Sequence, residues 1–265
     1  MGKLLDKYND VGKAHQRIIR EKKAETDKQN LFGDWWNNID LDLKKAEVKE
    51  IDFITAKKMI EEYEWLGCMP AFVWYCYGIY FDGNCGGVCV FSPDYAENTG
   101  VWDKYEYTGK LILLSRGVCV HWTPKNTGSK LIMDAIKMLP EKYKIVTCTI
   151  DRLAGEIGTI YQACNFNYVG VMREGKTRTA YKIDGKIYGT RALRAKIGTE
   201  KKEDVLKHFP TAEYCEQLSK ERYFYFIGNK KEQKYYKGKI EHLIKPYPKR
   251  NPNGFEKAEE GGAVF

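Results

Sequence analysis

A few polar side chains in this 265-residue chain stand where catalytic groups often stand, at the ends of apolar segments. Asp151 follows the apolar run 144–150, which we expect to be a buried strand. Polar groups converge at such strand ends in open α/β sheets, so Asp151 is either a general base or a cap for the segment that follows. Tyr161 and Asn165 stand one helical turn apart on the next expected helix, about 156–164, and either face the same cleft or serve the core.

Ser115 and Arg116 lie in the middle of the apolar run 111–122, which we expect to be another strand. An arginine that points inward from such a strand needs an acidic partner or an anionic ligand, whereas one that points outward needs neither. Glu64 stands where an expected helix, about 55–63, breaks. It is either a surface charge or a second carboxylate for the same cleft.

A turn from Pro124 to Ser129 joins this strand to an expected helix at 129–139. The turn with Gly128 opens the helix and offers free backbone N–H groups and a positive dipole end, while Lys125 adds charge. The motif GxxxxGK[ST] is absent, so the turn is not a nucleotide-hydrolysing P-loop. It is a candidate anion site, although most strand–turn–helix joints bind nothing.

The elements that must position these residues follow an α/β order. Two strands, 72–81 and 86–92, are joined by the hairpin signal Asp82-Gly83-Asn84, and Thr55 is the expected N-cap of the helix before them. A second hairpin is expected from 166–172 and 177–183, and the remainder is expected to be mostly helical apart from a strand at 222–228. This order predicts a layered α/β fold with a mixed sheet, because neither a βαβαβ alternation nor GxGxxG is present.

Composition excludes several classes of protein. Apolar residues make up 43 % of the chain, which is enough for a buried core, and no apolar run reaches the roughly 18 residues of a membrane helix. The N-terminus carries charges where a signal peptide needs an apolar centre, so we expect a cytoplasmic protein with no membrane partner. The eight cysteines form no CxxC pair and only four histidines are present, which argues against a structural zinc site.

Positive charge gathers in the C-terminal third. The net charge is +8, and the range 173–250 holds 21 Lys or Arg against 10 Asp or Glu. A surface of this kind suits nucleic acid, because each phosphate contact releases counterions, but it also suits a merely solubilising face.

Several stretches together resemble the phage Mom family of DNA-modification proteins. These are YEWLG (63–67), LSRGVCV (114–120), PKNTGSKLI (124–132), GEIGTIYQACNFNYVG (155–170) and the segment from RYFYFIG to KPYPK (222–249). The resemblance runs from about residue 50 to 249. It implies a fold like that of the GCN5-related acetyltransferases, and modification of adenine in phage DNA to a carbamoylmethyl form. It also implies acetyl-CoA as the source of the two-carbon unit.

The resemblance also implies roles for individual residues. In such a fold a central strand splays from its neighbour and its edge bonds the pantetheine arm, while the next helix start takes the pyrophosphate. The catalytic set is then Asp151, Glu64, Ser115, Arg116 and Tyr161. The cofactor-binding set is Gly117, Val118, Val120, Lys125, Asn126, Thr127, Gly128, Ser129 and Asn165.

Two features depart from the family pattern. The usual acetyltransferase loop reads [Q/R]-x-x-G-x-[G/A], and Lys125, Gly128 and Lys130 match it imperfectly. Many relatives carry His where this chain has Glu64 and Glu156. Carboxylates at both places alter the acid–base chemistry or the metal preference, so a bound metal ion stays open.

Three segments are expected: an N-terminal extension (1–45), an acetyltransferase-like core (46–190) and a basic C-terminal region packed on the core (191–265). The resemblance implies DNA as the partner, and a base flipped out of the duplex would stack on Trp65, Trp74 or Tyr161. Two alternatives stay open. An N-acetyltransferase for a protein or small amine would have the cofactor site without DNA affinity, and a non-catalytic DNA-binding protein would have the reverse.

Overall fold

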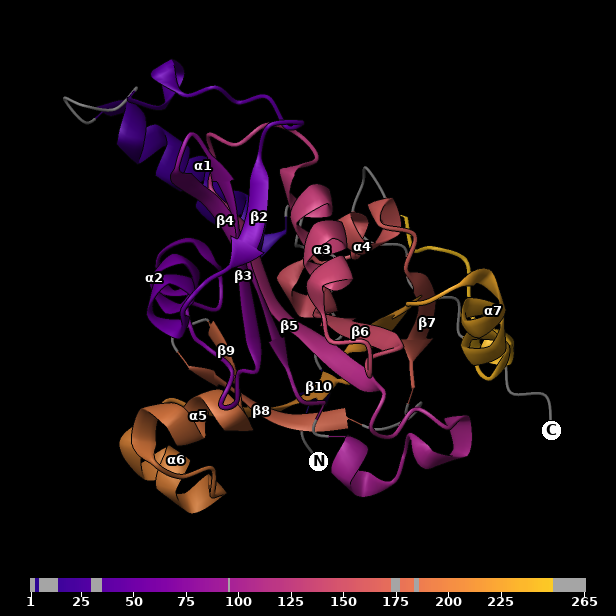
Figure 1. Ribbon diagram of the computed structural model, residues 1–265. Helices are drawn as coiled ribbons and strands as arrows, with labels where there is room; N and C mark the ends of the chain where they lie inside the picture. The colour runs from indigo at the N-terminus through magenta and orange to yellow at the C-terminus, as the bar shows by residue number, and fades with distance from the viewer. Residues whose placement is uncertain are drawn as a thin grey trace.

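The computed structural model describes residues 3–4, 14–29, 35–94, 96–172, 177–183 and 186–249. Its centre is a seven-stranded mixed sheet with the order β2-β3-β4-β5-β6-β11-β7 (Figure 1). The expected α/β class with a mixed central sheet is therefore confirmed. The strands are β2 (Glu47–Glu50), β3 (Tyr75–Phe81), β4 (Asn84–Ser92), β5 (Leu111–Cys119), β6 (Ile145–Ile150), β7 (Asn167–Val171) and β11 (Glu221–Phe226).

Two helices cover opposite faces of this sheet, because neighbouring side chains of a strand point to opposite sides. On one face, Ala56 and Ile60 of α2 (Phe53–Tyr63) are fully buried in a cluster with Val88 and Val90. On the other face, α3 (Thr127–Met138) packs its apolar stripe into the main core. That stripe consists of Leu131, Ile132, Ala135 and Ile136, and its partners include Tyr77 and Phe91.

The start of α2 differs from the expectation that Thr55 caps it. The helix begins at Phe53, and the Asp52 side chain accepts a hydrogen bond from the Thr55 backbone N–H at 2.9 Å. The carboxylate of Asp52 reaches the third helical amide, which is the usual geometry of an N-cap. Thr55 is therefore the residue that is capped, and its hydroxyl also donates to Asp52.

The C-terminal part of the chain contributes a strand to the middle of the sheet. β11 lies between β6 and β7 and is antiparallel to both, with Glu221 opposite Ile150 and Phe226 opposite Ile145. Because β7 pairs with β11, the expected hairpin of 166–172 with 177–183 does not form. One strand of the central sheet, β11, thus comes from the expected C-terminal region (191–265).

A second, four-stranded sheet has the order β1-β10-β8-β9 and lies below α2 in Figure 1. Its strands are β1 (Lys3–Leu4), β8 (Thr177–Ile183), β9 (Lys186–Gly189) and β10 (Glu213–Leu218), and it carries α5 (Thr190–Ile197) and α6 (Lys202–His208). It has a small core of its own, with Tyr181, Ile183, Leu193, Val205 and Ala212. β10 was expected to be helical, but it pairs along its length with β8.

The remaining helices are α1 (His15–Gln29), α4 (Thr159–Ala163) and α7 (Lys230–Gly238). Short 3₁₀ turns occur at Trp35–Asn38, Glu97–Thr99, Asp103–Tyr105, Arg152–Ala154 and Glu241–Leu243. Within the described ranges, no helix is long and apolar enough to cross a membrane.

The position of β11 generates a stability prediction. Phe224 is fully buried and its ring packs edge-on against Trp102, with ring centroids 5.7 Å apart. We expect Phe224→Ala to lower the free energy of unfolding by about 3–5 kcal/mol, because it leaves a cavity in the core. Urea unfolding followed by circular dichroism measures this.

Ile54→Ala is the matched control, because Ile54 is 74 % exposed and its truncation should change the free energy of unfolding by less than about 0.5 kcal/mol. Equal effects of the two substitutions would contradict the placement of β11 inside the sheet.

Candidate active site

The site is a cleft that opens where β5 and β6 part. The two parallel strands pair from Leu111 with Ile145 to Leu113 with Thr147, and then no described strand pairs with β5 on that side. On its other side β5 stays paired with β4, with a bulge at Ser115. The resulting cleft has a volume of about 1000 Å³ and is lined by β5, the starts of α3 and α4, α1 and the end of α2.

One end of the cleft is formed by the turn before α3. The residues from Lys125 to Ser129 all line it. Asn126 precedes the helix in the left-handed region with φ 69°, and its side chain makes no capping hydrogen bond. The first N–H groups of a helix have no partner within the helix, and the helix dipole adds partial positive charge there. This end suits a negatively charged group.

The absence of a side chain at Gly128 allows α3 and α4 to pack closely. A Cβ atom at this position would stand 2.5 Å from Cδ1 of Ile160 on α4, so the two elements approach as closely as a glycine permits. Gly117 and Val118 of β5 also line the cleft.

Two of the residues expected to bind a cofactor lie elsewhere. Val120 is buried, and its N–H donates to the Gly86 carbonyl at 2.9 Å, so its backbone is committed to the sheet. Asn165 comes after α4, has φ 58° and is exposed. Neither lines the cleft. The helix ends at Ala163, so Asn165 does not stand one helical turn above Tyr161.

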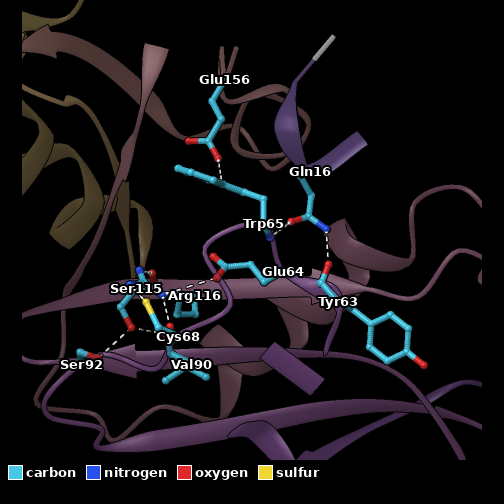
Figure 2. A network of polar contacts seen from close by, with 10 residues as sticks. All are labelled: Gln16, Tyr63, Glu64, Trp65, Cys68, Val90, Ser92, Ser115, Arg116 and Glu156. Atoms are coloured by element: carbon cyan, nitrogen blue, oxygen red, sulfur yellow. Dashed lines mark hydrogen bonds and ion pairs between the residues drawn. The ribbon is translucent and has the colours of Figure 1, made fainter. Parts of the chain in front are cut away.

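The other end of the cleft holds Glu64, the residue at which α2 ends. Its side chain is buried and turns toward Arg116, with Oε2 3.7 Å from Nε (Figure 2). Among the described residues, Oε2 has no hydrogen-bond partner. Burial raises the pKa of Glu64 to about 7, although the Arg116 charge opposes this, and the nearby Glu156 adds to the rise. Glu64 is therefore a carboxyl group that exchanges a proton near neutral pH.

Arg116 points into the cleft because its guanidinium is held at two places. Its Nε donates to the Cys68 carbonyl at 2.8 Å and its Nη1 donates to the Ser115 carbonyl at 2.7 Å. The bulge in β5 makes this possible, since an extra residue there re-aims the neighbouring side chains. Arg116 is thus an inward arginine with an acidic partner, Glu64.

Ser115 is tied to the sheet. Its hydroxyl donates to the Val90 carbonyl at 3.0 Å and lies 2.7 Å from the hydroxyl of Ser92 (Figure 2). A serine nucleophile needs a base to take its proton, and here that proton goes to a backbone carbonyl. Ser115 lines the cleft, and its contacts hold the bulge in place.

Tyr161 lines the cleft from α4, with its ring against Phe166 and Tyr223. Burial raises the pKa of its phenol well above the ordinary value, and nearby acidic groups add to this. The hydroxyl therefore stays protonated at neutral pH and serves as a donor.

Asp151 lies beside the cleft, outside its lining. Its carbonyl accepts hydrogen bonds from Ala154 and Glu156, so its backbone closes the turn after β6. Its carboxylate has Oδ2 3.7 Å from Nζ of Lys220, which does line the cleft. Asp151 thus closes the turn after β6 with its backbone and pairs with Lys220 through its carboxylate, whereas the residue before α4 is Gly158.

Two residues of this end, Glu156 and Lys220, were not among the expected catalytic set. Glu156 accepts hydrogen bonds from the Trp65 indole N–H at 3.0 Å and from the Asp151 N–H at 2.8 Å. Burial raises the pKa of Glu156, although these hydrogen bonds oppose the rise. Lys220 comes 69 residues after Asp151 but stands opposite it, because β11 pairs with β6 with Glu221 beside Ile150. No local motif signals such a long-range neighbour.

Of the three aromatic residues expected to stack on a base, two line the cleft and one lies outside it. Trp65 and Tyr161 line the cleft. Trp74 does not, and its ring lies 6.2 Å from that of Tyr143 and is 46 % exposed. Within the described part of the chain, no group of three or more His, Cys, Asp or Glu side chains is arranged to hold a metal ion.

A pH-dependence prediction follows from Glu64. In the unfolded chain this carboxyl titrates near its ordinary value of 4.5, whereas in the folded protein it titrates near 7. Between these values the folded state holds the extra proton, so the free energy of unfolding falls as the pH rises. Glu64→Gln cannot titrate and should remove about 3 kcal/mol of that fall.

Urea unfolding of both proteins at pH 4.5, 6 and 7.5 measures the difference. Glu62→Gln is the control, because Glu62 lies on the exposed side of the same helix. Parallel pH profiles for the wild type and Glu64→Gln would contradict the elevated pKa.

Comparison with known proteins places the chain in a family. The model of the Mom protein family matches residues 45–249, which is most of the sequence, and the chain belongs to this family. No curated protein matches the chain significantly.

Solved structures similar to this chain include several acetyltransferases. One, from Streptococcus pneumoniae, belongs to the GNAT family, with a TM-score of 0.39 and 12 % identity over 69 % of this chain and 100 % of that one. A GNAT family acetyltransferase from Elizabethkingia anophelis with acetyl-CoA bound has a TM-score of 0.38 and 9 % identity over 69 % and 98 %. A Drosophila melanogaster polyamine N-acetyltransferase has a TM-score of 0.36 and 8 % identity over 69 % and 100 %.

Proposed function

We propose that this member of the Mom family is a transferase that modifies adenine in DNA to a carbamoylmethyl form, with acetyl-CoA as the source of the two-carbon unit. Besides acetyl-CoA, this product requires an ammonia donor that displaces the CoA thiol and a two-electron oxidant that accepts the hydrogen lost from the methyl carbon. One observation carries the proposal: a single cleft joins a site for negative charge at the start of α3 to the buried carboxyl of Glu64. An acyl carrier needs the first end, and proton removal from an amine needs the second.

The residues of the cleft fit an acyl-CoA thioester, which is long and thin and carries its phosphates at one end. The first-turn N–H groups of α3 and the Lys125 side chain would hold phosphate. The unpaired edge of β5, with Gly117 and Val118, would hydrogen-bond the amide-containing arm. When bound, the cofactor supplies the activated two-carbon unit.

The chain's own residues would move the protons. The adenine amino group is a poor nucleophile because its lone pair is delocalised into the ring, so it needs a base. A general base works best with a pKa near the working pH, and Glu64 has a pKa of about 7. Arg116 stabilises the charged form of Glu64. Tyr161 would act as a hydrogen-bond donor, because its hydroxyl stays protonated. Asp151 lies close enough to the cleft to orient the amine through Lys220.

DNA would bind along the basic surface that begins at α7. Exposed lysines follow this helix and the segment after it: Lys230, Lys231, Lys234, Lys237, Lys245 and Lys249. That segment is held against the core, because Lys245 N–H donates to the Tyr168 carbonyl and the Pro248 carbonyl accepts from Gln162 of α4. Since α4 also lines the cleft, the end of this basic segment lies against an element of the cleft wall.

The product tests the function directly. DNA from cells that express the protein should contain a modified adenine, identified by mass spectrometry of its nucleosides. Glu64→Gln should lower the modified fraction by at least about a hundredfold, because general-base catalysis typically contributes that much or more. Asp151→Asn keeps the backbone that closes the turn, so a similar loss in this variant would show that its carboxylate also takes part.

An acetylated amine instead of a carbamoylmethyl group would indicate ordinary acyl transfer, in which the new bond forms at the carbonyl carbon. Unmodified DNA together with acetylation of a protein or small amine would contradict the proposed substrate.

Salt dependence tests the DNA surface. Lys234→Gln combined with Lys237→Gln removes two exposed charges of α7. We expect the slope of log affinity against log salt concentration to fall in magnitude by about two, because each lost phosphate contact removes about 0.9. Fluorescence anisotropy with labelled duplex DNA measures the slope.

Lys57→Gln combined with Lys58→Gln is the matched control, since these lysines are also exposed but lie on α2, on the opposite side of the molecule from α7 in Figure 1. Identical slopes for the α7 variant and the wild type would show that DNA binds elsewhere.

A further inference from the structure

Helix α1 lies outside the segment that the Mom family model matches, yet it forms one wall of the cleft. We propose that α1 completes the active site, with Gln16 as a positioning residue for Glu64 and Arg20 as a positioning residue for the turn before α3. This inference rests on the proposed function, because it assigns these residues to the same cofactor cleft.

Gln16 holds the chain on both sides of Glu64. Its Nε2 donates to the Tyr63 carbonyl at 2.7 Å, and its Oε1 accepts from the Trp65 N–H at 3.0 Å (Figure 2). The Tyr63 carbonyl belongs to the last turn of α2, where carbonyls lack partners within the helix. One side chain thus fixes the backbone before and after the buried carboxyl group. The ring of His15 adds an edge-on contact with the Trp65 ring at 5.3 Å.

Arg20 stands one helical turn further along the same face of α1. Its Nη2 donates to the carbonyls of His121 and Thr123, each at 3.1 Å. These carbonyls belong to the turn that leads into α3, so the guanidinium fixes the path of the chain just before the first-turn N–H groups. It also adds a positive charge to the cleft, where Lys125 and the start of α3 already favour an anion.

A third contact continues along the helix. Asp27 has Oδ2 3.4 Å from Nε2 of His121, which brings a third residue of α1 beside the same turn. Burial lowers the pKa of His121, so Asp27 and His121 form an ion pair only when the ring is protonated. The spacing of Gln16, Arg20 and Asp27 keeps all three on one side of α1. One helix therefore connects the end of the cleft that carries the base with the end suited to phosphate.

Two substitutions on one helix should consequently change two different quantities. Arg20→Ala should raise the Kd of acetyl-CoA by roughly ten- to a hundredfold, the range expected for lost hydrogen bonds from a charged group. It should leave the Kd of S-acetylpantetheine, which lacks the nucleotide phosphates, nearly unchanged. Arg20→Lys should recover part of the loss, because it keeps the charge and N–H donors.

Gln16→Ala should lower the reaction rate and leave the affinity for acetyl-CoA unchanged. It frees the backbone around Glu64, so the rate of base modification at saturating acetyl-CoA should fall by at least about tenfold while the Kd of acetyl-CoA is retained. Lys22→Ala is the control for both, because Lys22 is on the same helix, is exposed and does not line the cleft. It should change neither quantity.

Calorimetric titration of the full-length variants measures the Kd of each ligand, and their melting temperatures show whether the fold is retained. Arg20→Ala with wild-type affinity for acetyl-CoA would overturn the role of α1 while the proposed function stands. An equal loss for both ligands with a lowered melting temperature would also overturn it, since α1 would then only stabilise the fold. A wild-type protein that binds neither ligand would overturn the proposed cofactor, and the role of α1 with it.

Discussion

The parting of β5 from β6 after Leu113 is the constraint on which the rest of the site depends. Backbone N–H and C=O groups inside a protein need hydrogen-bond partners, and a strand that loses its neighbour leaves a row of them open. Beyond this point β5 stays paired with β4 and β6 stays paired with β11, so among the described strands the facing edges of β5 and β6 both open onto the cleft. The cleft is therefore lined by backbone that favours a ligand able to act as an additional strand.

The bulge at Ser115 sets the direction of the side chains along that edge. It lies on the β4 side of β5, and its hydrogen bonds to Val90 and Ser92 keep it in place. The result is that Arg116 reaches both the Cys68 carbonyl and Glu64. A straight strand would send alternate residues to the wrong face, so the local irregularity and the ion pair belong together.

Two neighbouring carboxyl groups then acquire different roles from their surroundings. Glu156 has one oxygen bonded to the Trp65 indole and the other to the Asp151 N–H, so it orders the structure around it. Glu64 keeps one buried oxygen without a hydrogen bond among the described residues, and its pKa lies near 7. Pairs of titratable groups with contrasting environments are typical of acid–base catalysis. The positive charges of Arg116 and Lys220 offset part of the repulsion between Glu64 and Glu156.

Local patterns were enough to predict most of the site's framework. The apolar runs located β3 to β6, and the turn from Pro124 to Ser129 led directly to a cleft-lining helix start. Arg116 was recognisable because it interrupts an apolar run, and Glu64 because it stands where the expected helix breaks.

The features of the site that could not be predicted depend on how strands far apart in the sequence pair with one another. Lys220 reaches Asp151 only through the pairing of β11 with β6, and β10 forms a strand only because β8 offers it an edge. The contribution of α1 is hidden for the same reason, since Gln16 and Arg20 look like ordinary polar positions of a charged helix until its place over the cleft is known.

The central claim is that the open edge of β5 and the start of α3 together bind acetyl-CoA. Hydrogen–deuterium exchange, measured with and without acetyl-CoA, tests it at the level of single segments. The account predicts slower exchange in residues 114–119 and 127–130 when the cofactor is present, with little change in the strands β8 to β10, which do not line the cleft. Unchanged exchange in both segments at saturating acetyl-CoA would contradict it.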